Sequence, residues 1–452
     1  MALSFQVIHK KPELVSPAKP TTHEIKAISD IDDQESLRSH YPMIMFYKNN
    51  PSMKGKDPVN VIREALAKAL VYYYPYTGRL VEEPDKKLKV DCTAKGVGFL
   101  EADAQVTLEQ LGDTIQPPCP YSEFLLAGDE GMLDCPLMFI QVTRLMCGGF
   151  VLAIRFNHVM SDALGSLQFV TALSEIAKGA STPSILPVWQ RDLLTARDPP
   201  RVTQAHPEYE IYRDHKSIIP STIDNKNLVR RSFSFGPEEI KAIRKNLSPE
   251  TRSCSNFDLI SACLWRSRTR ALQFNPDDDM RITCVVNGRG KNFLDLPVGY
   301  YGNAILCPAK VSKAKILCES PLGYAVKLVK EARTQATEEY ARSTIDFIAT
   351  KGRPEITHPG NLIVSDASKV GFDNVDFGWG KPIYGGTMYG VTYHNSSVYA
   401  RYRNLKGQSV MVVPVCLPAE VMEKFESELR RSIWEPVESS NTSHPIMFLS
   451  KL

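Results

Sequence analysis

The chain has 452 residues and a mass of 50.6 kDa, so it is longer than the roughly 250–300 residues at which one hydrophobic core stops growing. Hydrophobic residues make up 43% and charged residues 23%, a globular composition that excludes a disordered chain, a coiled coil and collagen. Lysine and arginine number 54 against 51 acidic residues, and this net charge of +3 gives no reason to expect nucleic acid as the main partner.

Apolar periodicity predicts the elements of the first half of the chain. Residues 58–74 have apolar side chains at helical spacing with a proline near the first turn, and residues 163–178 form a second amphipathic helix. Between residues 183 and 220, six prolines fall without sustained periodicity, which is typical of a segment that crosses between domains. Runs rich in β-formers predict strands at 88–92, 137–145 and 149–156.

The second half continues the alternation of strands and helices. Strands are predicted at 281–286, 361–364 and 409–418, the last of them broken by Pro414. Because strands and helices alternate in both halves, we expect an α/β protein with mixed sheets. Helices are predicted at 237–247, 256–272, 419–434 and, as one long helix, 321–340.

The chain shows few signals for membranes, disulfides or metals. No run of about 18 apolar residues is present, so we expect no membrane span, and the first residues are too polar for a secretory apolar region. The ten cysteines lack a paired spacing, which indicates reduced thiols, and no residues have the spacing of metal ligands.

The last three residues match a targeting signal. The chain ends in Ser450, Lys451 and Leu452, and a terminal Ser-Lys-Leu is the tripeptide that a peroxisomal import receptor reads. The residues before it are polar and poor in helix formers, so the tripeptide should be accessible. We therefore expect import into peroxisomes.

The first candidate site is the run 157–162, Asn-His-Val-Met-Ser-Asp. His158 follows a buried apolar strand and precedes an amphipathic helix, where α/β proteins build their sites. A histidine there is a natural general base, since its unperturbed pKa of about 6.5 is close to the working pH. The alternative is a histidine at the edge of the core, with Asp162 as the N-cap of the helix.

The second candidate site is the run Asp376, Phe377, Gly378, Trp379 and Gly380. A structural interpretation makes it a tight turn framed by glycines, with Trp379 packed in the core. No nucleophile elbow, Walker loop, dinucleotide fingerprint or zinc-protease motif is present in the sequence. Serine hydrolysis, nucleotide chemistry, NAD redox chemistry and zinc catalysis therefore have no support.

Together the two motifs resemble the signature pair of the BAHD family, the plant CoA-dependent acyltransferases. The resemblance runs nearly the full length and looks closest to the clade that acylates alcohols. Its segments include 29–34, 70–75, 78–80, 183–189, 286–290, 299–303, 364–366 and 414–418.

The resemblance implies a two-domain fold. It predicts two similar α/β domains of the chloramphenicol-acetyltransferase type, with mixed sheets and a solvent channel between them. The N-terminal domain would span residues 1–195 together with 373–401, and the C-terminal domain 221–452, with a crossover loop at 196–220. The family norm, together with the absence of a heptad seam, favours a monomer.

The resemblance also assigns roles to residues. His158 would take the proton from an acceptor hydroxyl, and the Trp379 indole N–H would donate to the oxyanion. Asp162 is grouped with this catalytic pair but would point away from His158 and pair with Arg289. Asp376, with Gly378 and Gly380, would fix the turn that presents Trp379.

No permanently bound cofactor is expected, because the co-substrate would be an acyl-CoA. By resemblance, the second domain binds it, and Ser253, Ser255 and Asn256 are the candidate contacts at the start of a helix. Family members usually carry threonine where Asn256 stands. Tyr389, Tyr393 and His394 make the stretch after the second motif bulkier than in relatives, either as a variable loop or as a reshaped acceptor pocket.

The clade and the peroxisomal signal together favour benzoyl-CoA as donor and benzyl alcohol as acceptor, giving benzyl benzoate. Benzoyl-CoA arises in plant peroxisomes, and the ester could feed salicylic acid synthesis. The alternatives within the family are acetyl-CoA with simple alcohols and benzoyl transfer to an alkaloid alcohol. An alternative of another class is a non-catalytic relative that binds acyl-CoA.

Overall fold

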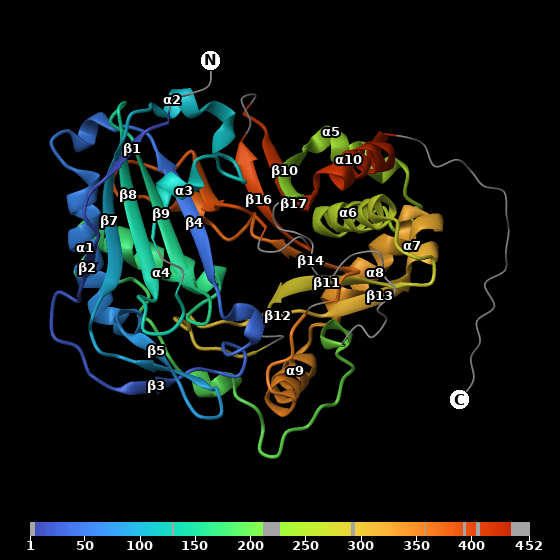
Figure 1. Ribbon diagram of the computed structural model, residues 1–452, viewed down its shortest axis with the longest axis horizontal. Coiled ribbons are helices and arrows are strands. Elements are labelled where there is room, and N and C mark those ends of the chain that lie inside the picture. Colours follow the sequence, from blue (N-terminus) through green and yellow to red (C-terminus); the bar gives the residue numbers. More distant parts are fainter. Residues whose placement is uncertain are drawn as a thin grey trace.

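A computed structural model describes residues 5–128, 131–210, 227–290, 294–356, 358–391, 395–403 and 407–434. Two seven-stranded mixed sheets form the two halves of the molecule, and helices cover each of them (Figure 1). A small third sheet contains β3 (Ile25–Ala27), β6 (Leu88–Asp91) and β5 (Arg79–Glu82). The expected α/β class with two sheet-rich halves is confirmed.

The first sheet holds most of the N-terminal half. In this sheet β7 and β8 run parallel to each other, and all the other neighbouring strands pair antiparallel. Its path is β1 (Val7–His9), β7 (Val97–Ala104), β8 (Met138–Leu145), β9 (Phe150–Asn157), β4 (His40–Tyr47) and β15 (Tyr384–Thr387), with β2 (Glu13–Val15) paired to β7.

The second sheet holds the C-terminal half. β14 lies between β11 and β16 and runs parallel to both. Its path is β10 (Leu228–Phe235), β17 (Ser409–Pro418), β16 (Ser396–Arg403), β14 (Asn361–Asp366), β11 (Asp279–Asn287) and β12 (Ile305–Leu306), with β13 (Ala309–Lys313) paired to β11.

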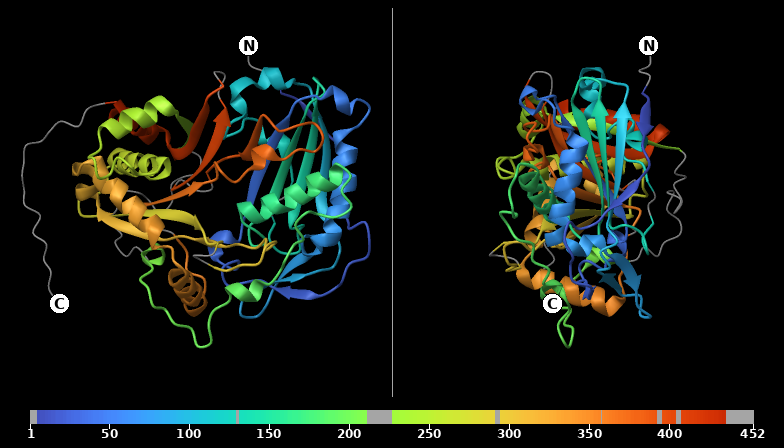
Figure 2. Two further views of the ribbon diagram at one scale, coloured as in Figure 1. Left: turned by 180° about the vertical axis from the view of Figure 1, so that it is seen from behind. Right: turned by 90° about the vertical axis from the view of Figure 1, so that its left-hand side faces the viewer.

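Helices α1 (Pro58–Tyr72) and α4 (Ala163–Ala177) cover one face of the first sheet, and Figure 2 shows α4 lying across the strands. Asp57 caps α1 by accepting a hydrogen bond from the Val59 amide, and Pro58 takes the first helical position. Short helices α2 (Leu108–Leu111) and α3 (Ser122–Leu125) complete this half.

Alternating side chains of β4 explain why the two halves pack together. Met43 and Met45 point to the core under α1 and α4, whereas Ile44 and Phe46 point to a second core that includes Val412 of β17. Both faces of the first sheet are therefore buried, one by its own helices and one against the C-terminal half.

Helices on the second sheet are α5 (Pro237–Lys245), α6 (Asn256–Leu272), α7 (Ala314–Glu319), α8 (Leu322–Gln335), α9 (Glu338–Lys351) and α10 (Ala419–Trp434). The single long helix expected at 321–340 is wrong. Its backbone becomes extended at Ala336, and the Thr337 hydroxyl accepts a hydrogen bond from the Tyr340 amide to cap a new helix.

The break expected at Pro414 is also wrong, because β17 continues to Pro418. β16 pairs with β17 only as far as Val412, so the proline lies beyond that ladder and its missing N–H costs no bond to β16. On its other side, Pro414 stands opposite Ser232 of β10.

The segment 373–401 divides between the two sheets. β15 pairs with β4 in the first sheet, with Tyr384 opposite Phe46, whereas β16 begins at Ser396 and lies in the second sheet. The chain therefore crosses back to the N-terminal half and returns. Within the crossover loop, residues 211–220 lie outside the described residues.

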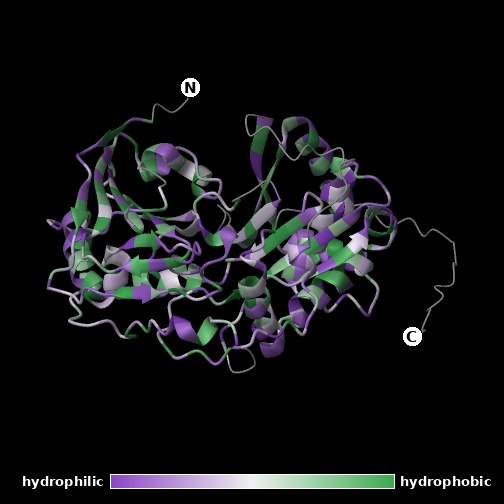
Figure 3. Ribbon diagram, turned by 60° about the horizontal axis from the view of Figure 1, so that its bottom comes forward, coloured by the Kyte–Doolittle hydropathy of each residue, from purple (hydrophilic) through white to green (hydrophobic). Residues whose placement is uncertain are grey.

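Polar and apolar residues alternate along the helices of both halves (Figure 3). Among the described helices, none is both long enough and apolar enough to span a bilayer. All ten cysteines lie in the described ranges as free thiols, as the lack of paired spacing predicted.

Candidate active site

His158 lies in the turn between β9 and α4. Its backbone N–H donates to the Ser39 carbonyl at 2.8 Å, which ties the turn to the chain just before β4. The Asn157 side chain accepts from the Val159 amide at 3.2 Å and tightens the same turn. The strand-to-helix junction predicted from the sequence therefore places His158 at the end of the first sheet.

One nitrogen of the His158 ring is buried. Nδ1 has no hydrogen-bond partner among the described residues. The residue as a whole is partly exposed. With the proton on Nδ1, the Nε2 lone pair is the one left to accept a proton.

Burial lowers the pKa of His158 below its usual value, although Asp162, Asn303 and Asp32 oppose the shift. Desolvation disfavours the charged imidazolium, so the ring is neutral at pH 7. A neutral imidazole with an accessible nitrogen is the form that accepts a proton from a hydroxyl.

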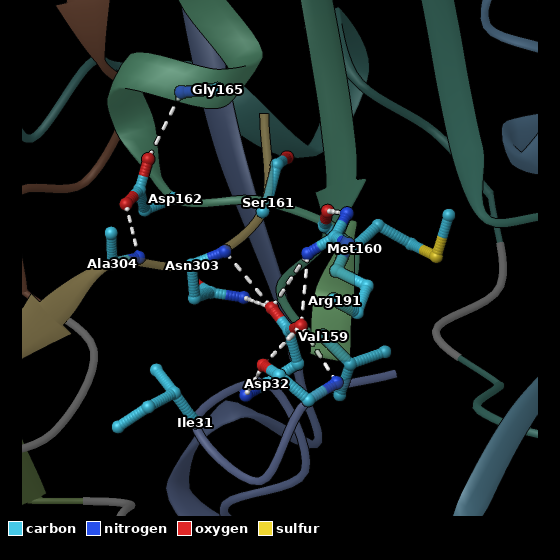
Figure 4. A network of polar contacts seen from close by, with 12 residues as sticks. Ile31, Asp32, Val159, Met160, Ser161, Asp162, Gly165, Arg191, Asn303 and Ala304 are labelled. Atoms are coloured by element: carbon cyan, nitrogen blue, oxygen red, sulfur yellow. Dashed lines mark hydrogen bonds and ion pairs between the residues drawn. The ribbon is translucent and has the colours of Figure 1, made fainter. Parts of the chain in front are cut away.

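Beneath His158 lies a buried carboxylate that binds three parts of the chain together. Asp32 Oδ1 accepts from the Asn303 backbone N–H at 2.9 Å and from its Nδ2 at 2.8 Å. Arg191 Nη1 donates to both carboxylate oxygens, at 2.8 and 2.9 Å. All three side chains are at most 1% exposed, and Figure 4 shows Arg191 and Asn303 converging on Asp32.

This network holds the backbone of the turn that carries His158. Asn303 Nδ2 also donates to the His158 carbonyl at 2.7 Å, and Arg191 Nη2 donates to the Met160 carbonyl at 2.7 Å. Asp32 therefore fixes, through Asn303 and Arg191, the two carbonyls that flank Val159.

Asp162 has a different environment from His158. Its Oδ1 accepts from the Leu164 and Gly165 amides, which makes it the N-cap of α4. Its Oδ2 accepts from the Ala304 amide at 3.0 Å, as Figure 4 shows, and from Arg289 Nη1 at 2.6 Å. The expected ion pair with Arg289 is present, and the cap interpretation holds as well.

Trp379 is not near His158. Its ring packs edge-on against Phe150, with centroids 5.2 Å apart, and Phe150 begins the strand that ends just before His158. Eight residues of extended chain separate Phe150 from His158, roughly 25 Å at about 3.3 Å per residue. The expectation that Trp379 donates to an oxyanion at His158 therefore has to be corrected, because its indole lies at the opposite end of β9.

The second motif is instead a packed turn. Asp376 Oδ1 accepts from the Gly378 amide at 2.7 Å and from the Gly380 amide at 2.8 Å. Both glycines have positive φ, +106° and +88°, and a Cβ on Gly378 would lie 2.9 Å from Met53 Cε. Trp379 is only 6% exposed, so the glycine-framed turn with a core tryptophan describes this segment.

The candidate CoA contacts lie at the start of α6. Ser255 accepts from the Asp258 amide as the N-cap, and Ser253, Ser255 and Asn256 are all exposed. Asn256 lines a cavity of about 310 Å³ between α5, α6, β16 and β17. Ser253 and Ser255 are not among its lining residues, which include Ser368, Arg401 and Ser409.

The bulky residues after the second motif are only partly described. Tyr389 is half-buried beside the core between the halves, and the Arg230 guanidinium lies 5.8 Å from its ring centroid. Tyr393 and His394 lie outside the described residues. Within the described ranges, no three histidine, cysteine, aspartate or glutamate side chains form a group that could hold a metal ion.

The sequence did not assign a role to Asp32, Arg191 or Asn303. Asp32 and Asn303 lie 271 positions apart and meet only in the folded chain. The sequence pointed to Asp32 and Asn303 only indirectly, since segments 29–34 and 299–303 both belong to the family resemblance.

A family model describes most of this chain. The model of the Transferase family matches residues 5–431. The chain belongs to the Transferase family of BAHD acyltransferases. This acyltransferase is therefore an enzyme that uses an acyl-CoA to acylate an alcohol.

Curated relatives of this acyltransferase match over nearly its whole length. It is 52% identical over 446 residues to alcohol acyl transferase 1 allele GSa of Malus domestica, covering 96% of each chain. It is 51% identical over 433 residues to benzyl alcohol O-benzoyltransferase of Petunia hybrida, covering 94% of each.

Solved structures share the fold of this acyltransferase. The crystal structure of vinorine synthase matches with a TM-score of 0.71 and 22% identity, covering 95% of this chain and 99% of that one. F. sporotrichioides TRI101, complexed with coenzyme A and T-2, matches with a TM-score of 0.68 and 18% identity, covering 89% and 97%. These neighbours confirm the chloramphenicol-acetyltransferase type of architecture.

The lowered pKa of His158 predicts the acid limb of the pH profile. A general base must be neutral, so with His158 in that role we expect kcat/KM to fall as the pH drops through the pKa of the folded enzyme. We expect a midpoint below the ordinary histidine value of about 6.5, because burial lowers this pKa. Initial rates from pH 4.5 to 8 measure it, and a midpoint above 6.5 would contradict the described burial.

Proposed function

We propose that the enzyme transfers a benzoyl group from benzoyl-CoA to benzyl alcohol, with His158 as the general base. The observation that carries the base assignment is the neutral imidazole at the end of β9, with Nδ1 buried and the residue as a whole partly exposed. The choice of benzoyl is supported by the 51% identity to a protein named benzyl alcohol O-benzoyltransferase.

In the proposed reaction, His158 Nε2 accepts the hydroxyl proton while the alcohol oxygen attacks the thioester carbonyl. The tetrahedral intermediate then collapses, the C–S bond breaks, and the imidazolium returns the proton to the leaving CoA thiolate. A thioester is already activated, so no covalent enzyme intermediate is required. The products are an ester and free CoA.

The donor is tested by following thiol release with benzoyl-CoA and acetyl-CoA, each with benzyl alcohol and with an aliphatic alcohol. We expect the highest kcat/KM for benzoyl-CoA with benzyl alcohol. Turnover with acetyl-CoA alone would remove the benzoyl assignment and leave the acyltransferase class intact.

Acetyl transfer to simple alcohols is the second candidate. The Malus relatives, named only as alcohol acyl transferases, are 52% identical to this chain, so identity does not separate them from the benzoyltransferase. The same thiol-release comparison decides between the two donors.

We further propose that the cavity of about 310 Å³ receives the phosphate-bearing end of CoA. Arg401 is the one charged side chain of its lining, with Asn256, Ser368 and Ser409 as polar neighbours. Arg401 Nη2 donates to Asp373 at 2.7 Å, and both side chains are partly exposed. A solvated arginine of this kind can exchange a carboxylate for a phosphate.

Arg401→Gln is therefore expected to raise KM for benzoyl-CoA by roughly tenfold, since one charge-assisted hydrogen bond is lost. It should leave KM for benzyl alcohol unchanged. The N-acetylcysteamine thioester of benzoate lacks phosphates, so its kinetics should be the same in variant and wild type. Equal loss with both thioesters would place the phosphates elsewhere. Arg403→Gln, on the same strand but outside the cavity lining, is the control.

Peroxisomal localisation is proposed from Ser450, Lys451 and Leu452, which lie outside the described residues. In that compartment the enzyme would meet benzoyl-CoA, and its ester would serve salicylic acid synthesis. Removal of the three residues from a fluorescently tagged chain, with the tag at the N-terminus, should move the signal to the cytosol. Unchanged localisation would exclude the receptor as a partner.

The enzyme is proposed to act as a monomer. Light scattering coupled to gel filtration should give a mass near 50.6 kDa. A mass near twice that value would contradict this proposal.

A further inference from the structure

Four hydroxyl groups form a chain of hydrogen bonds beside the catalytic turn. Tyr76 Oη donates to Ser161 Oγ at 2.8 Å, and Ser161 Oγ lies 2.8 Å from Ser166 Oγ. Ser166 Oγ contacts Tyr41 Oη, and Tyr41 Oη donates to the Ser161 carbonyl at 3.1 Å. Tyr76, Ser161 and Ser166 are fully buried.

The order of donors in this chain follows from counting protons. The Ser161 carbonyl can only accept, so it takes the Tyr41 proton. Tyr41 Oη then accepts from Ser166, Ser166 accepts from Ser161, and Ser161 accepts from Tyr76. Every hydroxyl donates once, and such one-directional chains strengthen each member. Because the chain ends on a backbone carbonyl, it leads no proton to His158 and serves to hold the Tyr41 ring.

The ring held in this way lies against His158. The centroids of Tyr41 and His158 are 4.5 Å apart with the planes tilted by 55°. On the neighbouring strand, Phe156 stacks on Tyr41 at 5.7 Å and 26°, and the two residues are paired across β4 and β9. Tyr41 is thus fixed by a hydroxyl at its tip and by a ring beside it.

We propose that Tyr41 is a positioning residue for His158, whose ring orients the imidazole and stabilises the imidazolium formed during acyl transfer. An aromatic ring within about 6 Å of a cation attracts it, and the attraction strengthens where water is excluded. The inference rests on His158 as the base of the proposed function.

Tyr41→Leu tests the contribution of the aromatic ring. We expect kcat to fall about tenfold, a typical effect of one desolvated cation–π contact. The acid limb of kcat/KM should also move to lower pH, because a less stable imidazolium loses its proton more readily. A purely structural role would lower kcat without moving the limb.

Two aromatic variants separate the ring from the hydroxyl. Tyr41→Phe keeps the ring and breaks the chain, so the limb should stay in place while kcat falls less than in Tyr41→Leu. Tyr41→pentafluorophenylalanine keeps the shape and reverses the ring's charge distribution, so its limb should lie below that of Tyr41→Phe. This pair remains informative if Tyr41→Leu does not fold.

The remaining charges around His158 are unchanged in these variants. Asp162 and Asp32, which favour the protonated ring, stay paired with Arg289 and Arg191, and His40 with its neighbour Arg155 stays on the adjoining strands. Tyr47→Phe is the matched control, since Tyr47 is a buried tyrosine at the far end of β4 that donates to the Val375 carbonyl. The acid limb of its kcat/KM profile should have the same midpoint as that of the wild type.

An acid limb that does not move in Tyr41→Leu, or that is the same in the Tyr41→Phe and pentafluoro variants, would overturn the inference. The proposed function fails by a different result, namely full activity of His158→Gln. The two failures are therefore distinguishable.

Discussion

His158→Gln is expected to lower kcat for ester formation by about 10²–10⁴-fold, the usual contribution of a general base. Glutamine can fill the space of the imidazole but cannot accept a proton from an alcohol. KM for benzoyl-CoA should change little, because the proposed contacts for its phosphates line a separate cavity. Steady-state thiol release measures both constants.

His40→Gln is the matched control for this variant. His40 begins β4, pairs with Asn157 in register, and has a buried Nδ1, so it resembles His158 in position and burial. Burial and the charge of Arg155 lower its pKa to about 4. We expect less than a tenfold change in kcat. A large loss in His40→Gln with little loss in His158→Gln would reverse the assignment of the base.

Asp32→Asn is expected to lower the free energy of unfolding by about 3–5 kcal/mol, the effect of leaving a buried charge without its partner. Arg191 is 1% exposed and donates to both oxygens of Asp32, so the substitution leaves its guanidinium buried and uncompensated. Asparagine keeps one acceptor oxygen, but its amide nitrogen cannot accept, so the donors of Arg191 and Asn303 can no longer all be satisfied and the hold on the His158 carbonyl weakens. Urea unfolding and kcat measure the two effects.

The double variant Asp32→Asn with Arg191→Met separates stability from activity. Removing the orphaned charge should recover much of the unfolding free energy, since buried ion pairs are often replaceable by apolar side chains. Activity should stay low, because the Met160 carbonyl also loses its donor. Glu423→Gln, which removes an exposed partner of Arg231, should leave the free energy of unfolding almost unchanged. An equally small effect of Asp32→Asn would contradict the described burial.

Local patterns in the sequence predicted most elements. Helices 58–74, 163–178 and 256–272 and the strand before His158 appear where their apolar spacing placed them. The break between α8 and α9 was missed because the apolar spacing continues across it, and only the Thr337 cap marks the new helix. Local patterns also placed His158 at a strand-to-helix junction.

Contacts that join distant segments were beyond the sequence. Asp32, Arg191 and Asn303 belong to three separate stretches and form one network only after the two halves pack. The family resemblance, in contrast, suggested a contact that is absent. Trp379 and His158 belong to the two motifs that signal the same family, but they lie at opposite ends of β9. A shared signature therefore did not imply a shared site. The Asp162–Arg289 pair was expected from the resemblance, and no spacing in the chain indicates it.

The most direct test of the central claim is product analysis by gas chromatography with the purified full-length enzyme, benzoyl-CoA and benzyl alcohol. The account predicts benzyl benzoate from the wild type, in excess over benzyl acetate when equal acetyl-CoA competes, and only background ester from His158→Gln. Equal ester formation by wild type and His158→Gln would contradict the assignment of His158 as the base. Absence of ester with either donor would contradict the proposed reaction itself.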